Sequence, residues 1–203
     1  MQARVIVIAG PSGSGKSRLA RRLGLPVLNL DDFYRDGDDP SLPRLDMGVV
    51  DWDHPASWLH DDALLAIERL CRNGKAEVPV YDISQDGRTG HQWLELHGSS
   101  YFVAEGIFAQ EVVTECADRG LLADAICVRH HRLVTFWRRL ARDLGEHRKP
   151  PWVLVRRGLM LLRAEPTVVA HAVALGCVAL TPEQAYRRLS ALIGSAAHPG
   201  TPQ

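Results

Sequence analysis

A chain of 203 residues is long enough for one α/β domain with a core that needs no disulfides. We therefore expect a single domain over residues 1–195 and a flexible tail over 196–203. Basic and acidic residues number 24 each, so the net charge gives no case for a nucleic-acid or membrane partner. The four cysteines have no CxxC spacing, which argues against zinc and against a disulfide framework. With no apparent signal peptide or membrane span, we expect a soluble, cytoplasmic protein.

Short apolar runs alternate with helical patterns along the chain. The runs predicted as strands are residues 5–9, 27–30, 101–104, 125–128 and 177–180. The patterns predicted as helices are residues 16–23, 58–72, 108–119, 133–144, 152–163 and 182–193. This alternation predicts an α/β fold in which a five-stranded parallel sheet has helices on both faces and ligands at the carboxyl ends of its strands. Residues 36–55, rich in Asp, Pro and Gly, are predicted as a loop that becomes ordered on binding.

The segment GPSGSGKS follows the first predicted strand and fits the P-loop pattern GxxxxGK[ST] at every fixed position. Its glycines let backbone N–H groups point at phosphate oxygens, above the positive end of the helix that follows. Lys16 is expected to reach the β- and γ-phosphates, and Ser17 to offer its hydroxyl to Mg²⁺. The sequence thus predicts a P-loop NTPase fold that binds a nucleoside triphosphate through Gly10, Ser12, Gly13, Ser14, Gly15, Lys16 and Ser17.

Charge is unevenly distributed along the chain. Ten Asp residues lie within 31–62, whereas nine Arg residues and Lys149 lie within 129–163. A phosphotransferase, which must hold Mg²⁺ and neutralise phosphate, would use both regions. Two solvated charged faces would give the same pattern.

Further motifs distinguish among the functional classes of P-loop proteins. No Asn/Thr-Lys-x-Asp tetrapeptide is present to read guanine, and nothing resembles the second module of a mechanical ATPase. Asp31 follows the second predicted strand, where an acceptor hydroxyl would meet the γ-phosphate. Glu105 follows the third predicted strand, as a carboxylate near Mg²⁺ would.

Five motifs occur in a family-specific order within residues 5–149. After the P-loop they read Asp31-Asp32-Phe33-Tyr34, Trp52-Asp53-His54-Pro55, Pro79-Val80-Tyr81-Asp82, Glu105-Gly106-Ile107 and the Arg-rich segment 138–143. Together they resemble the uridine/cytidine kinase branch of the phosphoribulokinase/uridine kinase family of P-loop kinases. The resemblance implies ATP and Mg²⁺ as cofactors, and a helical, Arg-rich lid over about residues 138–151.

The resemblance also implies roles for individual residues. Asp31 would orient or deprotonate the acceptor hydroxyl and would join Ser17 and Glu105 around Mg²⁺. Lys16 and the lid residues Arg139 and Arg142 would act on the transferring phosphoryl group. Arg139 and Arg142 are three residues apart and share one helix face, whereas Arg138 is expected on a solvated face.

The resemblance further implies that five side chains contact the acceptor. Asp53 would bind the ribose hydroxyls, beside Trp52 where the family usually has Phe. Tyr34 would form a wall of the site and Tyr81 would line the base pocket, although both aromatics could equally be packing residues. The fifth residue is Asp86, which stands where uridine kinases usually carry a His. An ionised carboxylate only accepts hydrogen bonds, so Asp86 disfavours ordinary uridine.

The lid departs from the family as well. His147 and Lys149 replace two arginines, and Pro150-Pro151 stops the lid helix. Residues 152–176 have no counterpart in the family pattern.

The sequence therefore predicts an ATP-dependent kinase that phosphorylates the 5′-hydroxyl of a pyrimidine nucleoside, uridine or cytidine. A possible homo-oligomer is left open. One alternative is a P-loop kinase of another small hydroxyl compound, such as a sugar, glycerate or a pantothenate-like molecule. The other is a non-catalytic nucleotide-binding regulatory module, which would not need both Asp31 and Glu105.

Overall fold

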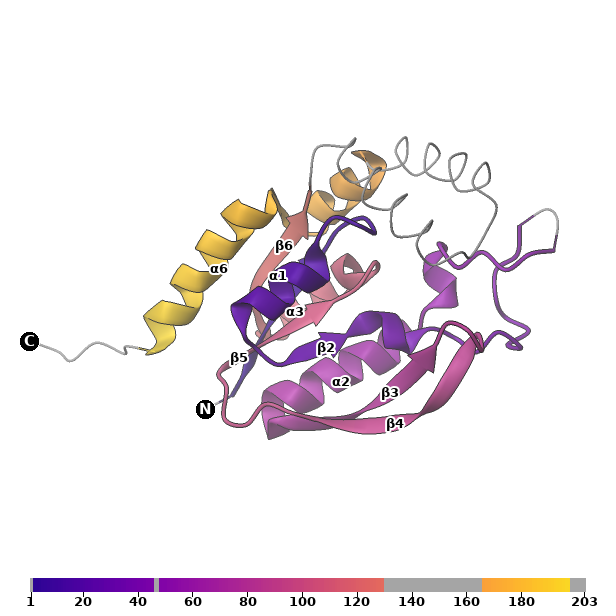
Figure 1. Cartoon of the computed structure of the whole chain (residues 1–203), viewed down its shortest axis with the longest axis horizontal. Coiled ribbons are helices and arrows are strands. Elements are labelled where there is room, and N and C mark those ends of the chain that lie inside the picture. The colour runs from indigo at the N-terminus through magenta and orange to yellow at the C-terminus, as the bar shows by residue number, and fades with distance from the viewer. Residues whose placement is uncertain (1, 46–47, 130–165, 198–203) are drawn as a thin grey trace, which may run out of the picture.

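The computed structural model describes residues 2–45, 48–129 and 166–197 (Figure 1). The helices predicted over 133–144 and 152–163, and with them the lid, lie outside the described residues.

A parallel sheet of five strands forms the centre of the molecule. Its strands stand in the order β2-β5-β1-β6-β7. They are β1 (Arg4–Ala9), β2 (Val27–Asn29), β5 (Tyr101–Glu105), β6 (Leu122–Val128) and β7 (Val178–Leu180). All five lie where the sequence predicted strands, and the predicted α/β class is confirmed. Because the strands are parallel, their carboxyl ends meet at one edge of the sheet.

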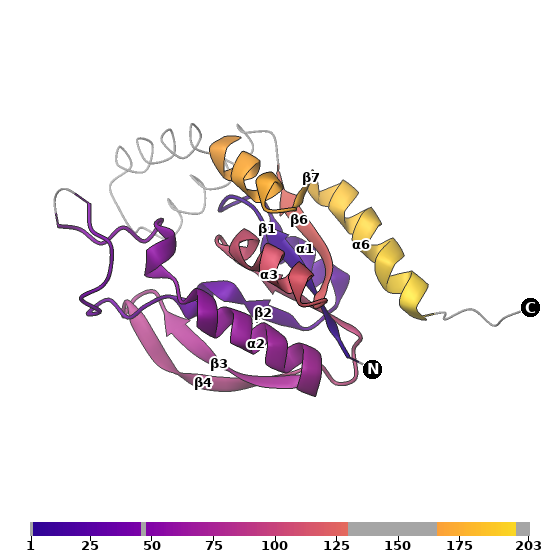
Figure 2. The same ribbon diagram turned by 180° about the vertical axis from the view of Figure 1, so that it is seen from behind.

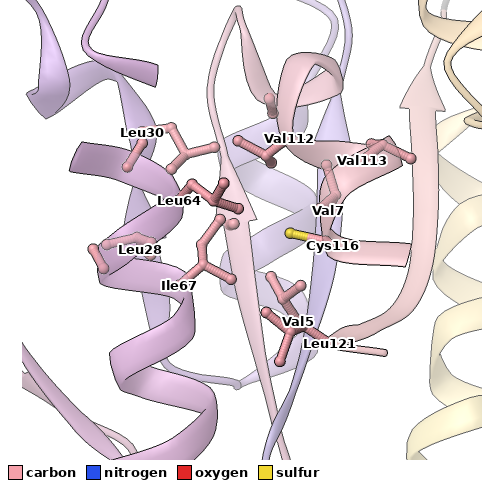
Figure 3. Packing of buried hydrophobic residues seen from close by; sticks show 14 of the residues in the cluster. Val5, Val7, Leu28, Leu30, Leu64, Ile67, Val112, Val113, Cys116 and Leu121 are labelled. Carbon is pink, nitrogen blue, oxygen red and sulfur yellow. The ribbon is translucent and has the colours of Figure 1, made fainter. Parts of the chain in front are cut away.

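Helices cover both faces of this sheet. On one face lie α1 (Lys16–Leu23) and α6 (Pro182–Ala197), packed against Ile6 and Ile8 of β1. On the other lie α2 (His60–Asn73) and α3 (Val113–Asp118), packed against Val5 and Val7. Figure 3 shows this second cluster, in which Leu64 and Ile67 of α2 and Cys116 of α3 lie over one face of the sheet. The apolar runs are continuous because successive side chains of one strand enter opposite cores.

The helix bounds differ from the predicted ones at several places. The predicted helix 58–72 begins at His60, because the short 3₁₀ turn η2 (Pro55–Ser57) precedes it. The predicted helix 108–119 is divided into a 3₁₀ turn, η3 (Ala109–Val112), and α3. Residues 166–174 are also helical, which was not predicted. No described helix is both long and apolar enough to cross a membrane.

An antiparallel hairpin was missed altogether. It consists of β3 (Lys75–Asp82) and β4 (Gly87–Glu95), and it lies outside the central sheet, alongside α2 (Figure 2). β4 is exposed along most of its length and contains Gly87 and Gly90, so it carries no alternating apolar pattern. Its stability comes from pairing with β3, which packs on α2. No local pattern in the sequence indicates such a strand.

Candidate active site

The P-loop connects β1 to α1 in a conformation that depends on its glycines. Gly10, Gly13 and Gly15 have φ angles of +135°, +78° and +96°, in the left-handed half of the map that only glycine adopts without strain. At Gly10 a Cβ would lie 2.4 Å from the carbonyl oxygen of Val128 in β6. The loop therefore rests on the neighbouring strand as well as on its own. This explains why the pattern fixes glycine at this position.

The ammonium group of Lys16 is held by backbone carbonyl groups of the loop. Lys16 is buried, and its Nζ donates hydrogen bonds to the carbonyl oxygens of Gly10 (2.8 Å) and Pro11 (3.4 Å). Ser17 is exposed at the start of α1, whereas Ser14 is fully buried and its Oγ has no hydrogen-bond partner among the described residues. The exposed hydroxyl of Ser17 can therefore serve as an oxygen ligand.

One cavity joins the P-loop to the ends of β2 and β5. Its volume is about 400 Å³. The lining residues are Ser12, Gly13, Gly15, Lys16, Ser17, Arg18, Arg21, Asp31, Glu105 and Ile107. The structure thus brings together the lysine, the hydroxyl and the two carboxylates that the sequence singled out. Arg18 and Arg21, on the exposed side of α1, were not predicted.

Asp31 lies in a 3₁₀ turn, η1 (Leu30–Phe33), that begins where β2 ends. The side chain of Asn29 accepts a hydrogen bond from the Asp31 amide (3.3 Å), and the indole of Trp58 donates to the Leu30 carbonyl (2.7 Å). These contacts fix the backbone on which the carboxylate is mounted.

The carboxylate itself is held by the segment that follows β5. The Ile107 amide donates to Asp31 Oδ1 at 2.9 Å. This close approach requires a glycine before Ile107, because a Cβ on Gly106 would lie 2.8 Å from the same oxygen. The sequence marked Glu105-Gly106-Ile107 as a motif but did not indicate that its glycine and its last amide hold Asp31.

Electrostatics favour proton acceptance by Asp31. Burial raises its pKa above the ordinary value, against the opposing effects of the Ile107 hydrogen bond and the charge of Lys16. A carboxylate with a raised pKa binds a proton more readily, as a general base must. Burial also raises the pKa of the neighbouring Asp32, which hydrogen bonds from the Asn29 side chain and the Tyr81 backbone oppose.

Glu105 is the last residue of β5 and is 8% exposed. It lies opposite Asn29 of β2 and Ile8 of β1 in the sheet register, at the edge from which both the P-loop and η1 emerge. The oxygen atoms of Ser17, Asp31 and Glu105 form a hard donor set on one cavity, which suits Mg²⁺ with several retained waters.

A cluster of aromatic rings continues the site beyond Asp31. The Tyr34 ring centroid lies 5.7 Å from Trp52, 5.9 Å from Tyr81 and 6.0 Å from Phe108. The Tyr34 hydroxyl donates to the Trp52 carbonyl at 3.1 Å. Burial, followed by the charges of Asp31 and Asp53, raises the Tyr34 pKa. Three of the predicted acceptor residues therefore meet in one cluster, and Phe108 is a member that the sequence did not indicate.

The two remaining acceptor residues lie at the rim of this cluster. Asp53 is exposed, and its amide donates to Asp51 Oδ1 at 3.2 Å. Asp86 is exposed in the hairpin turn, with a φ of +47°. Burial, together with the charge of Asp86, raises the pKa of Tyr81 to about 12. His54 caps η2 by accepting a hydrogen bond from the Ala56 amide at 3.1 Å.

The predicted lid arginines, Arg139 and Arg142, lie outside the described residues. The described part of the site therefore consists of a phosphate-binding half on β1 and α1, a carboxylate pair at the ends of β2 and β5, and an aromatic cluster. This arrangement on a parallel sheet defines a P-loop kinase.

A comparison with solved structures agrees with this fold. A crystal structure from Silicibacter sp. TM1040, described as a candidate fructose transport system kinase, matches with a TM-score of 0.63 and 17% identity over 83% of this chain and 85% of that one. At this identity the match shows the shared fold alone. No protein-family model matches the chain.

Two curated relatives identify the family. The uridine kinase of Deinococcus deserti is 34% identical over 171 residues, which are 78% of this chain and 77% of that protein. The uridine kinase of Schizosaccharomyces pombe is 31% identical over 151 residues, which are 71% of this chain but only 32% of that longer protein. The chain belongs to the uridine kinase family, and it is a kinase.

Proposed function

We propose that the protein transfers the γ-phosphoryl group of ATP, with Mg²⁺, to the 5′-hydroxyl of a pyrimidine nucleoside. One observation carries this proposal: the Asp31 carboxylate is fixed by the Ile107 amide in the same cavity as Lys16 and Ser17. Tyr34, the centre of the aromatic cluster, follows Asp31 by three residues, and its pKa is raised mainly by burial and also by the charge of the nearby Asp31. In this proposal Asp31 is the general base, close both to the phosphate-binding loop and to aromatic rings against which the pyrimidine would pack.

In this proposal the phosphate half of the site neutralises charge. Lys16 would bind the β- and γ-phosphates, and Ser17, Asp31 and Glu105 would hold Mg²⁺. The metal would stabilise negative charge on the transferring phosphoryl group. Arg139 and Arg142 would add guanidinium groups from a lid over about residues 138–151, within a kinase domain of residues 1–195 and ahead of a flexible tail over 196–203.

The acceptor half would position the nucleoside. Asp53, beside Trp52, would bind the ribose hydroxyls, while Tyr34 and Tyr81 would flank the base next to Asp86. Asp31 would take the proton of the 5′-hydroxyl as that oxygen forms a bond to the γ-phosphorus and the bond from phosphorus to the departing ADP oxygen breaks. The buried free cysteines are compatible with a cytoplasmic location for this enzyme.

The test is ADP release from ATP and Mg²⁺ with uridine, cytidine, purine nucleosides, free sugars and glycerate as acceptors. We expect turnover with uridine or cytidine, and their ratio measures the effect of Asp86 at the position where the family carries His. Asp31→Asn keeps the size of the side chain but removes the base, so turnover should fall about 10²- to 10⁴-fold. Thermal stabilisation by ATP in the absence of Mg²⁺ should remain, because Lys16 and the loop amides are unchanged, and this controls for an intact P-loop.

Other results would contradict parts of the proposal. Turnover on a sugar or glycerate, without turnover on any nucleoside, would retain the mechanism and reject the nucleoside acceptor. ATP binding without turnover on any acceptor would instead favour a regulatory nucleotide-binding module.

A further inference from the structure

The end of the β3–β4 hairpin carries two of the proposed acceptor residues. Tyr81 lies near the end of β3, and Asp86 lies in the turn before β4. The hairpin forms no ladder with the central sheet, and β3 packs on α2 and on η1. A two-stranded sheet is marginally stable alone, so contacts at its end decide where that end lies.

An ion pair ties the end of the hairpin to the loop that follows Tyr34. Arg88 Nη2 donates to Asp36 Oδ2 at 2.8 Å, and Arg88 Nε lies 3.3 Å from both carboxylate oxygens. The Arg88 amide donates to Asp36 Oδ1 at 2.7 Å. The guanidinium and amide of Arg88 hold the pKa of Asp36 below its ordinary value. Such a multidentate pair is more specific in geometry than an ordinary surface ion pair.

A second contact brings the two backbones together beside this pair. The Gly37 amide donates to the Asp86 carbonyl. A Cβ on Gly37 would lie 2.8 Å from the Asp86 Cβ and 3.0 Å from its carbonyl oxygen. Only glycine permits this approach, so residue 37 also fixes the hairpin turn. We call Asp36, Gly37 and Arg88 the acceptor latch.

The acceptor latch is continuous with the aromatic cluster. Arg88 is the cross-strand partner of Tyr81 in the hairpin register. The Tyr81 hydroxyl donates to the carbonyl of Arg35 at 3.4 Å, and its ring packs against Tyr34. The segment from Tyr34 to Gly37 therefore contacts the hairpin at successive residues. A displacement of Arg88 would therefore also displace Tyr81, its partner on the neighbouring strand.

We propose that the acceptor latch determines affinity for the acceptor by holding Tyr81 and Asp86 against the loop after Tyr34. This inference rests on the proposed function and adds Asp36, Gly37 and Arg88 as positioning residues. Their side chains need not touch the nucleoside. The phosphate half of the site is carried by β1 and α1, so loss of the latch should leave ATP binding unchanged.

The kinetic test compares Arg88→Ala, Asp36→Ala and the double variant, with the nucleoside that the wild-type enzyme uses. Each single variant should raise the acceptor KM about tenfold, the size typical of coupled contacts, with kcat and the ATP KM within about twofold of wild type. The double variant should resemble the single ones, because either change removes the same pair.

Arg188→Ala is the matched control. Arg188 makes a comparable two-point ion pair with Asp124 (2.7 and 3.1 Å), but it joins α6 to β6 away from the acceptor residues. It should leave the acceptor KM unchanged. An unchanged KM in Arg88→Ala, or an equal rise in Arg188→Ala, would overturn the inference.

Hydrogen exchange of the unliganded chain tests the same inference without turnover. Arg88→Ala should speed amide exchange in residues 81–88 and leave α2 unaffected, whereas Arg188→Ala should leave 81–88 unaffected. Unchanged exchange at 81–88 in Arg88→Ala would reject the latch. Faster exchange in a protein that turns over no nucleoside would retain the latch and reject the proposed function.

Discussion

Gly106 is a residue at which the active site has no room for a side chain. It lies between Glu105, the end of β5, and Ile107, whose amide holds the Asp31 carboxylate. Its φ is not in the left-handed region, so the requirement for glycine is one of space alone. The conformation of Asp31 therefore depends on a residue that carries no chemistry itself.

Gly106→Ala tests this dependence. The new Cβ would lie 2.8 Å from Asp31 Oδ1 and 2.9 Å from the Leu30 Cβ, so the carboxylate must move. Misplacement by about 1 Å can cost about 100-fold in rate, and we expect kcat to fall about 10- to 100-fold with little change in the ATP KM. Gly194→Ala in α6, where a Cβ meets open space, is the control and should keep the wild-type kcat. A wild-type kcat in Gly106→Ala would show that the contact does not position the base.

The raised pKa of Asp31 implies that the carboxylate proposed for catalysis lowers the stability of the folded chain at neutral pH. Because burial raises its pKa above the unfolded value, the folded chain binds the proton more tightly, and stability decreases as the pH rises through this interval. In metal-free buffer, Asp31→Asn should therefore unfold at a higher temperature than wild type at about pH 7. The difference should shrink as the pH falls below the ordinary Asp range. A variant that is less stable than wild type at neutral pH would contradict this reasoning.

At the scale of elements, the short turn η1 is anchored by a residue from another segment. Trp58 is 4% exposed, and its indole N–H donates to the carbonyl of Leu30, the first residue of η1. Its ring also packs against Phe108, at a centroid distance of 5.9 Å. One side chain thus joins the turn that carries Asp31 to the segment that follows β5.

Trp58→Phe removes the hydrogen bond while keeping an aromatic ring. The Leu30 carbonyl would lose a buried partner, which should lower the free energy of unfolding by about 1–3 kcal/mol in urea titrations. Trp93→Phe provides the comparison, since Trp93 is 62% exposed on β4 and should change stability by less than about 0.5 kcal/mol. Equal effects of the two substitutions would show that the indole bond to η1 is not the cause.

Elements that are buried on both faces were predicted from the sequence, whereas elements that depend on tertiary contacts were not. The strands of the central sheet were predicted because both faces are buried, which gives short continuous apolar runs such as Val5 to Ala9. β4 was missed because its side chains are largely exposed and its pairing with β3 is a tertiary feature. The start of α2 was placed two residues early because Trp58 is buried by tertiary contacts and reads as part of the helical apolar pattern.

At the scale of the whole molecule, the parts of the site that sequence predicted are those fixed by topology. The P-loop follows the first strand, Asp31 lies just beyond β2, and Glu105 ends β5, so their convergence is a consequence of parallel strand order. Gly106, Phe108 and Arg88 were missed as site residues because their roles depend on what lies beside them after folding.

Because the two sheets are separate, the two halves of the proposed site can change independently during evolution. The phosphate-binding loop belongs to the central sheet, whereas Tyr81 and Asp86 belong to a hairpin with its own pairing. Under the proposed function, substitutions in the hairpin would therefore alter the choice of acceptor without disturbing the strands that support phosphoryl transfer. Selection for a new acceptor would act on about twenty contiguous residues, Lys75 to Glu95. For the redesign of the substrate range, this hairpin is a compact unit that could be exchanged between relatives.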